Sequence, residues 1–251
     1  MSTKTVPTTP TPTQGEMYLV SAGIGDADNL TLKALKTIQS ADLILAMPFV
    51  EKQLAEHFPE GVEILDAGHG LFTSLARSGV DSSEIEKRET HVRHRVRQAV
   101  SEGLCVVVVE FGDPTLFGPQ VGYLGEFHDL NPVIIPGISS FNAANALLAQ
   151  PLLHSSSQRL MMTTAGGIKD YTGIPPDVLV LFTMRLNVEE LCSNLLKLYT
   201  SDTPLVLVLS AGFNKHERVI HLTLESFREQ GEELEIPWAC LIYVGAIDVD
   251  R

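Results

Sequence analysis

Four consecutive valines, Val106 to Val109, constrain the fold of this chain more than any other feature. A strand with one solvated face alternates apolar and polar side chains, whereas this run has no polar residue and should be buried on both faces. Strands of that kind are typical of parallel sheets that carry helices on both sides. The run therefore predicts an α/β fold.

The segments around this run support the same prediction. Short β-branched stretches alternate with longer helical patterns, which predicts a repeated β-α-β order and a parallel sheet in the first half of the chain. Ser83 and Glu86 have the spacing of a capping box at the start of one of these helices. The predicted strands are 17–22, 42–46, 62–66, 104–110 and 132–135, and the predicted helices are 30–40, 48–57, 83–102 and 119–128.

The pattern changes after Pro136-Gly137. A short polar turn separates the apolar stretches 204–210 and 218–222, which indicates a hairpin and hence a mixed sheet in the second half. We therefore expect two α/β domains, residues 17–136 and 137–251, with a ligand cleft between them. The remaining predicted strands are 159–164, 178–183 and 238–245, and the remaining predicted helices are 139–150, 187–199 and 223–230.

The composition excludes several classes of function. The chain has 251 residues, of which 44% are apolar and 20% charged, as in soluble globular proteins. Its formal net charge of −13 argues against nucleic acid as a partner, because phosphate binding needs a basic surface. No apolar run approaches the roughly 20 residues that span a bilayer, so no membrane partner is expected. Residues 1–16, rich in Thr and Pro, lack a targeting pattern and are predicted to form a disordered tail.

The cysteines point to the compartment. Cys105, Cys192 and Cys240 are odd in number, widely spaced and placed in apolar segments. They lack metal-ligand spacing, so we expect free buried thiols in a reducing cytoplasm and no metal site.

Two glycine-containing loops follow predicted strands. Gly23 and Gly25 lie between strand 17–22 and helix 30–40, where bare backbone approaches a ligand at the sheet edge. The dinucleotide fingerprint fails because the third glycine is missing, which places a nicotinamide dehydrogenase last among the alternatives. The loop 110–118 follows the valine strand and contains Gly-Asp-Pro, which by itself is also ordinary turn vocabulary.

Together these loops resemble those of a known family. The stretches Ala22-Gly23-Ile24-Gly25-Asp26, Gly112 to Gly118 and Ile135 to Ala144, with weaker matches later, are similar in order and spacing to the tetrapyrrole (corrin and porphyrin) methylases. That family depends on S-adenosylmethionine and includes diphthine synthase. The resemblance spans about residues 17–246 and implies the family's two-domain fold, a methyltransferase activity and a homodimer.

The resemblance also implies the cofactor contacts. Ile24 stands where the family usually has proline, and Ser139 and Ser140 match a Thr/Ser-Ala pair that contacts S-adenosylmethionine. Met184 and Gly212 match contacts around the adenosine, although core packing is the alternative for a methionine. The residues expected to line the methionine end are Phe111, Gly112, Asp113 and Leu116.

Departures from the family pattern bear on the methyl acceptor. Phe111 and Pro119 replace a glycine and an arginine of the uroporphyrinogen-III methylases, whereas Ser139-Ser140-Phe141 and 211–220 are more similar to precorrin-4 C11-methylases. We therefore expect C-methylation of a corrin-pathway tetrapyrrole. Two alternatives stay open: a peptide or protein side chain as acceptor, and a non-catalytic regulatory module that binds the cofactor. No catalytic residue is assigned.

A tetrapyrrole carries many carboxylates, so a binder with a net charge of −13 needs a local basic patch. Helix 83–102 is the densest candidate, although charge runs are usually solvated surface. His69, between two glycines after strand 62–66, is a candidate acid or base. The basic residues considered are Arg77, Arg88, His91, Arg93, His94, Arg95, Arg97, Arg159 and Arg185.

Overall fold

The structure is a computed structural model that describes residues 15–77, 81–155, 157–184 and 186–248. Most of the predicted tail and the candidate Arg185 lie outside these residues. The chain forms two compact units. Of the described residues, the first unit contains 15–23 and those within Ala27–Ser139, and the second contains Ile24–Asp26 and those from 140 to 248.

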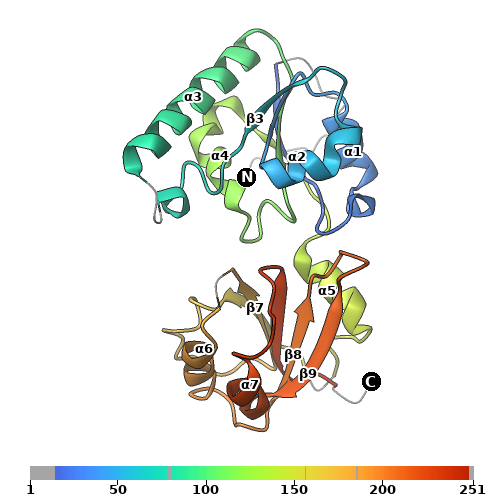
Figure 1. The fold of residues 1–251 in the computed structure, drawn as a ribbon, viewed down its shortest axis with the longest axis vertical. Coiled ribbons are helices and arrows are strands. Elements are labelled where there is room, and N and C mark those ends of the chain that lie inside the picture. The colour runs from blue at the N-terminus through green and yellow to red at the C-terminus, as the bar shows by residue number, and fades with distance from the viewer. Residues whose placement is uncertain (1–14, 78–80, 156, 185, 249–251) are drawn as a thin grey trace, which may run out of the picture. The chain divides into compact units, whose positions relative to one another are not determined.

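The first unit is built on a five-stranded, fully parallel sheet with the strand order β3-β2-β4-β1-β5. Each predicted strand of this half is present within two residues of its expected bounds. The strands are β1 (Met17–Ser21), β2 (Leu43–Ala46), β3 (Glu63–Asp66), β4 (Val106–Glu110) and β5 (Val133–Ile135). The helices are α1 (Leu32–Ile38), α2 (Pro48–Leu54), α3 (Ser82–Ser101) and α4 (Gly122–Glu126). Figure 1 shows the helices α3 and α4 on one side of this sheet and α1 and α2 on the other.

The valine run is the central strand of this sheet, and all four side chains are fully buried. Val106 and Val108 pack in the core under α3 and α4, whereas Val107 and Val109 pack in the core under α1 and α2. The prediction of a strand covered on both faces is therefore confirmed.

The start of α3 differs from the prediction. Asp81 is the N-cap, and its side chain accepts a hydrogen bond from the backbone N–H of Ser83. The predicted capping box of Ser83 and Glu86 is therefore wrong, because the helix begins at Ser82 and Ser83 already lies inside it. An aspartate serves this position as well as a serine does, since either supplies an acceptor for an unpaired N–H of the first turn.

The second unit contains a mixed five-stranded sheet in the order β6-β7-β10-β8-β9. β6 and β7 are parallel, and the other neighbours are antiparallel, including the predicted hairpin of β8 and β9. The strands are β6 (Leu160–Thr164), β7 (Val178–Thr183), β8 (Pro204–Leu209), β9 (Arg218–Thr223) and β10 (Cys240–Gly245). The helices are α5 (Ser140–Leu148), α6 (Val188–Leu195) and α7 (Leu224–Gln230).

Helices cover both faces of this sheet as well. Ala144 and Leu148 of α5 pack on one face, and the apolar residues of α6 and α7 pack on the other. The three cysteines are buried and unpaired. Among the described helices, none combines the length and the apolar character that crossing a bilayer requires.

Burial rather than side-chain size should set the stability of the first sheet. Val108→Ala removes two methyl groups from a fully buried site and should lower the free energy of unfolding by about 1–3 kcal/mol. The matched control Ile134→Ala removes more carbon from a side chain that is 38% exposed and should cost less. Urea unfolding followed by circular dichroism measures both, and a larger loss for Ile134→Ala would contradict this account.

Candidate functional site

The connections after the adjacent strands β1 and β4 run to opposite faces of the sheet. The chain after β1 leads to α1 on one face, whereas the chain after β4 leads to α4 on the other. In open α/β sheets, ligands bind at the carboxyl ends of strands where the connections part in this way. The loops after Ser21 and Glu110 therefore occupy the position expected of a ligand site.

Ser21 joins these two loops. Its buried hydroxyl donates to the carbonyl oxygen of Gly112 at 2.6 Å and accepts from the backbone N–H of Gly23 at 3.1 Å. The N–H of Gly112 donates to the carbonyl of Gly23 at 2.8 Å, which closes an antiparallel bridge between the loops. A β-carbon on Gly137 would lie 2.2 Å from the Ser21 oxygen, so the loop after β5 also approaches this point.

Glu110, the last residue of β4, fixes the loop that follows this strand by hydrogen bonds to its buried side chain. Its carboxylate accepts hydrogen bonds from the backbone N–H of Phe111 at 2.8 Å and from that of Gln120 at 2.7 Å. One fully buried side chain thus holds both ends of the segment 111–120. Gly118 fits beside it because a β-carbon there would lie 2.8 Å from the Glu110 Oε2.

Burial changes the titration of this carboxyl group. Loss of solvation raises the pKa of Glu110 from 4.5 to about 7, and the charge of Asp113 adds to the rise. The two N–H donors oppose the shift because they stabilise the ionised form.

Gln120 extends the same network to the loop after β3. Its Nε2 donates to the carbonyl of Gly68 at 2.7 Å, while its buried Oε1 has no hydrogen-bond partner among the described residues. Gly68 and Gly70 both have positive φ, and His69 between them is exposed. The structure thus brings the candidate acid or base His69 to the same sheet edge as the loops after β1 and β4.

The first unit contains five of the predicted cofactor contacts. Gly112 has φ of +93°, and a β-carbon there would meet no atom within 4 Å, so its backbone faces open space. Asp113 is half-buried, and its Oδ1 accepts from the N–H and hydroxyl of Thr115, both at 2.8 Å. Phe111 packs edge-on against Phe49. Leu116 is half-buried and Ser139 is buried.

In the second unit, the predicted contacts Ile24 and Gly212 come from distant parts of the chain but share one backbone junction. The N–H of Asp26 donates to the carbonyl of Gly212 at 2.7 Å, and the Asp26 carboxylate accepts from the N–H of Asn214 at 3.1 Å. A β-carbon on Gly25 would come within 2.0 Å of the Gly212 backbone. Only glycine fits at that approach.

Met184 and Ser140 are the other predicted contacts in this unit. Met184 follows β7 and is 59% exposed, which excludes core packing. It lies at the same end of the sheet as Gly212, because β8 ends next to the start of β10, and β10 begins beside Thr183. Ser140 is the first residue of α5 and is half-buried.

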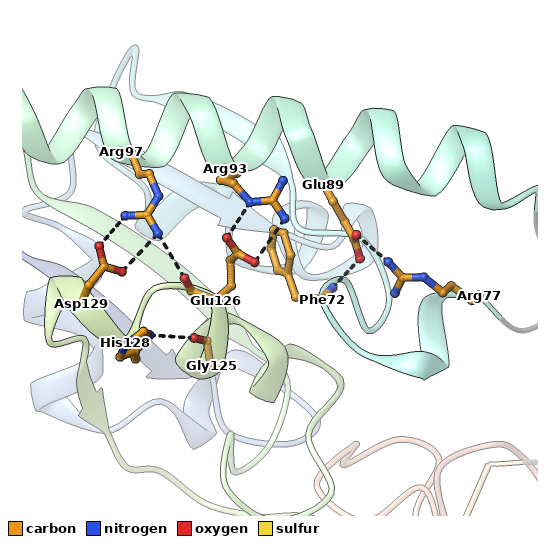
Figure 2. Close-up of polar contacts among 9 residues, drawn as sticks. All are labelled: Phe72, Arg77, Glu89, Arg93, Arg97, Gly125, Glu126, His128 and Asp129. Carbon is orange, nitrogen blue, oxygen red and sulfur yellow. Dashed lines mark hydrogen bonds and ion pairs between the residues drawn. The ribbon is translucent and has the colours of Figure 1, made fainter.

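The arginines of α3 do not form an open basic patch. Figure 2 shows Arg93 paired with Glu126, Arg97 with Asp129 and Arg77 with the buried Glu89. The Arg93 and Arg97 guanidinium groups also lie 5.5 and 5.4 Å from the ring centres of Phe72 and Phe127. Arg88 and Arg95 pair with Asp66 and Glu63 of β3, and Arg159 pairs with Asp177.

These ion pairs give the many arginines of α3 a structural role. Each guanidinium of α3 meets a carboxylate from another element, so the helix is fastened to β3 on one side and to the α4 region on the other. The pairing raises the pKa of Arg93, Arg95 and Arg97 through the hydrogen bonds to their partners. The hypothesis that this cluster binds substrate carboxylates, which the sequence favoured less than a solvated surface, finds no support in these contacts.

Ser21, Glu110 and Gln120 were not among the sequence candidates. Glu110 was predicted only as the last residue of the strand 104–110. A charged residue directly after four buried valines is the signal that could have singled out Glu110. Within the described residues, no group of three His, Cys, Asp or Glu side chains is placed to hold a metal ion.

Comparison with known proteins places these loops in context. The sequence model of the family described as Tetrapyrrole (Corrin/Porphyrin) Methylases matches residues 16–228. The uroporphyrinogen-III C-methyltransferase of Priestia megaterium is 30% identical over 93% of this chain and 98% of its own length. That of Bacillus subtilis is 29% identical over 93% and 91%. Siroheme synthase of Pseudomonas paraeruginosa is 26% identical over 93% of this chain. The chain spans only 50% of the length of that relative.

Solved structures show the same architecture. Uroporphyrin-III C-methyl transferase from Thermus thermophilus, complexed with S-adenyl homocysteine, is 25% identical with a TM-score of 0.67 over 92% of this chain and 98% of that one. A cobalt precorrin-4 methyltransferase, a cobalamin biosynthetic enzyme, has a TM-score of 0.73 at 22% identity over 93% and 96%. The latter likeness supports the predicted two-domain α/β fold.

Glu110 should give the protein's stability a definite pH dependence. Its pKa in the folded protein, about 7, lies above the ordinary 4.5, so the folded state binds the proton more tightly than the unfolded chain does. Ionisation of Glu110 therefore lowers the free energy of unfolding. This loss is absent at low pH, grows as the pH rises from 4.5 to about 7 and is complete above about pH 7. At about 1.4 kcal/mol per pKa unit it amounts to about 3 kcal/mol.

Glu110→Gln removes this titration. Part of the loss caused by ionisation is already present at pH 5, so the loss of unfolding free energy between pH 5 and pH 8, measured with urea, should shrink by about 2.5 kcal/mol in the variant. The control Glu60→Gln alters an exposed side chain and should keep the dependence of the parent. Parallel pH profiles for Glu110→Gln and the parent would contradict the assignment.

Proposed function

The chain belongs to the tetrapyrrole (corrin/porphyrin) methylases, and on that premise we propose that it is an S-adenosylmethionine-dependent methyltransferase that methylates a carbon atom of a tetrapyrrole. The observation that carries the proposal is the junction of Ser21, Gly23 and Gly112 at the carboxyl ends of β1 and β4. It holds bare backbone at the sheet position where such folds bind nucleotide-like ligands.

The residues of the first unit suit the amino-acid end of this cofactor. Gly112 faces open space, so a ligand can approach its backbone. The half-buried carboxylate of Asp113 supplies negative charge for an ammonium or sulfonium group. Its Oδ1 is fixed by Thr115, which orients the group before any ligand arrives. We propose that Phe111, Leu116 and Ser139 complete this part of the site.

The residues of the second unit suit the adenosine. Gly212 is held against Ile24–Asp26, and the exposed, flexible Met184 offers an apolar surface for a purine ring. We propose that Ile24, Ser140, Met184 and Gly212 contact this end of the cofactor. When bound, the cofactor supplies an electrophilic methyl group on a sulfonium. The protein's task is to position donor and acceptor in line, which needs no covalent intermediate on the protein.

The relatives support a tetrapyrrole as the methyl acceptor. Proteins named uroporphyrinogen-III C-methyltransferase match over nearly the whole chain, and a precorrin-4 methyltransferase shares the fold. We propose a tetrapyrrole acceptor of the corrin pathway, with uroporphyrinogen III as the first compound to try. A protein side chain as acceptor, and a regulatory module without turnover, are the two competing proposals.

We also propose that the protein is a homodimer that works in the cytoplasm. The family resemblance is the ground for the dimer. Three buried cysteines with free thiols support a reducing compartment. Sedimentation analysis of the purified chain tests the first of these statements, and a monomer at micromolar concentration would contradict it.

A substitution at Met184 tests cofactor binding without changing the stability of the fold. Met184→Ala truncates an exposed side chain, so the free energy of unfolding should change by less than about 0.5 kcal/mol. The affinity for S-adenosylhomocysteine should fall by about tenfold as an apolar contact is lost. Calorimetry measures the affinity. The matched control is Met162→Ala on β6, which is 38% exposed and outside the proposed contacts, and it should bind as the parent does.

A transfer assay distinguishes the three proposals. The protein is incubated with S-adenosylmethionine labelled in the methyl group, and either uroporphyrinogen III, a precorrin-containing extract or a protein extract of its own cell is added. Label in a tetrapyrrole supports the principal proposal. Label in protein alone supports a side-chain acceptor, and binding of S-adenosylhomocysteine without turnover of any acceptor supports the regulatory module.

A further inference from the structure

An acidic protein that binds a polycarboxylate needs basic groups that its own acids do not neutralise. The arginines of α3 and Arg159 fail this requirement, because each is already paired with a carboxylate. The substrate carboxylates therefore require other basic side chains, which must border a hollow large enough for a carboxyl-bearing substituent.

One pocket of the second unit meets this requirement. It lies between the turn that joins β8 to β9 and the segment before β10, and its volume is about 490 Å³ (Figure 1 shows the hairpin). Three basic residues within four positions of the chain line it, together with two apolar residues. The lining residues are Ser210, Lys215, His216, Arg218, Glu235, Ile236 and Pro237.

The charges of this pocket are available to a ligand. Lys215, His216 and Arg218 are exposed, and within the described residues none of them forms an ion pair. Glu235 is the one acid among the lining residues, and no ion pair joins it to these basic groups in the described part of the chain. At neutral pH, Lys215 and Arg218 therefore outnumber the opposing charge.

The acidic residue of the β8–β9 turn, Glu217, does not point its charge into the pocket. Glu217 lies between His216 and Arg218 in sequence, but its Oε2 accepts from the backbone N–H of Gly212 at 3.3 Å and does not line the pocket. Hydrogen bonds from the N–H groups of His216 and Glu217 to the carbonyl of Phe213, at 2.7 and 3.0 Å, fix the turn. The basic side chains thus project from a fixed backbone that also carries the proposed adenosine contact Gly212.

We propose that this pocket is a subsite for a carboxylate substituent of the tetrapyrrole acceptor, with Lys215 and Arg218 binding the carboxylate and Ile236 and Pro237 supplying apolar contact. The inference rests on the proposed function for the identity of the acceptor. It predicts that affinity grows with the number of carboxylates on the macrocycle and falls with ionic strength, since the contacting charges are exposed.

The single tryptophan of the chain makes the site observable. Trp238 directly follows Pro237 of the pocket lining and is 57% exposed. Its fluorescence should be quenched when a porphyrin occupies the pocket. Uroporphyrin III serves as the probe, and coproporphyrin III, which has fewer carboxylates, should bind more weakly.

Opposite charge changes should move the affinity in opposite directions. The double variant Lys215→Ala, Arg218→Ala should weaken uroporphyrin III binding by about tenfold, and Glu235→Gln should strengthen it by about threefold. The control Lys33→Ala, Lys36→Ala on α1 removes the same charge from exposed positions outside the pocket and should change the affinity by less than about twofold.

Two results would overturn the inference. One is that the pocket double variant and the control double variant weaken uroporphyrin III binding equally. The other is that neither the pocket double variant nor Glu235→Gln changes the affinity for uroporphyrin III. Calorimetry with S-adenosylhomocysteine keeps this failure distinct from failure of the proposed function. The parent and the pocket variants should all bind that ligand alike. If the parent binds S-adenosylhomocysteine but the pocket variants bind uroporphyrin III as the parent does, the inference fails and the proposed function stands.

Discussion

The hydrogen bonds that join the loops after β1 and β4 are the constraint on which the candidate site depends. Ser21 satisfies a carbonyl of one loop and an N–H of the other, and Glu110 holds both ends of the second loop from inside the fold. A buried polar group without partners is costly, so each of these contacts fixes the backbone in one geometry. The loops can therefore offer Gly112 to a ligand without first becoming ordered.

The distribution of charge follows a similar logic. α3 carries many basic residues, yet they act as fasteners to β3 and to the α4 region rather than as a binding surface. Surface ion pairs contribute little individually, but two of these guanidinium groups also stack on aromatic rings of the core. This leaves the short β8–β9 turn, with far fewer charges, as the better place to bind an anionic ligand.

Much of the fold could be predicted from the sequence. The strands and helices follow from local periodicity, and the valine run of β4 settles its position inside a parallel sheet. The glycines at 23, 25, 112 and 212 identify the loops, because all four positions have a positive φ that favours glycine. Periodicity is a local property, and it therefore indicates elements but not their partners.

Most of the missed features depend on contacts between distant parts of the chain. The role of Ser21 requires knowing that residues 91 positions apart are adjacent. Glu110 holds Gln120, only 10 positions away, but the loop geometry that joins them is not visible in the periodicity. The arginines of α3 look solvated until Glu63, Glu126 and Asp129 are placed beside them. The capping error at Ser83 is of another kind, since two plausible N-caps lie two residues apart.

Hydrogen exchange with and without S-adenosylhomocysteine tests the central claim most directly, because it reports on the backbone N–H groups of every segment at once. We expect the ligand to slow exchange in residues 111–116 of the first unit and in residues 210–214 of the second, and to leave exchange in α3 and α7 unchanged. Slowed exchange confined to other segments, or no change anywhere at saturating ligand, would contradict this claim.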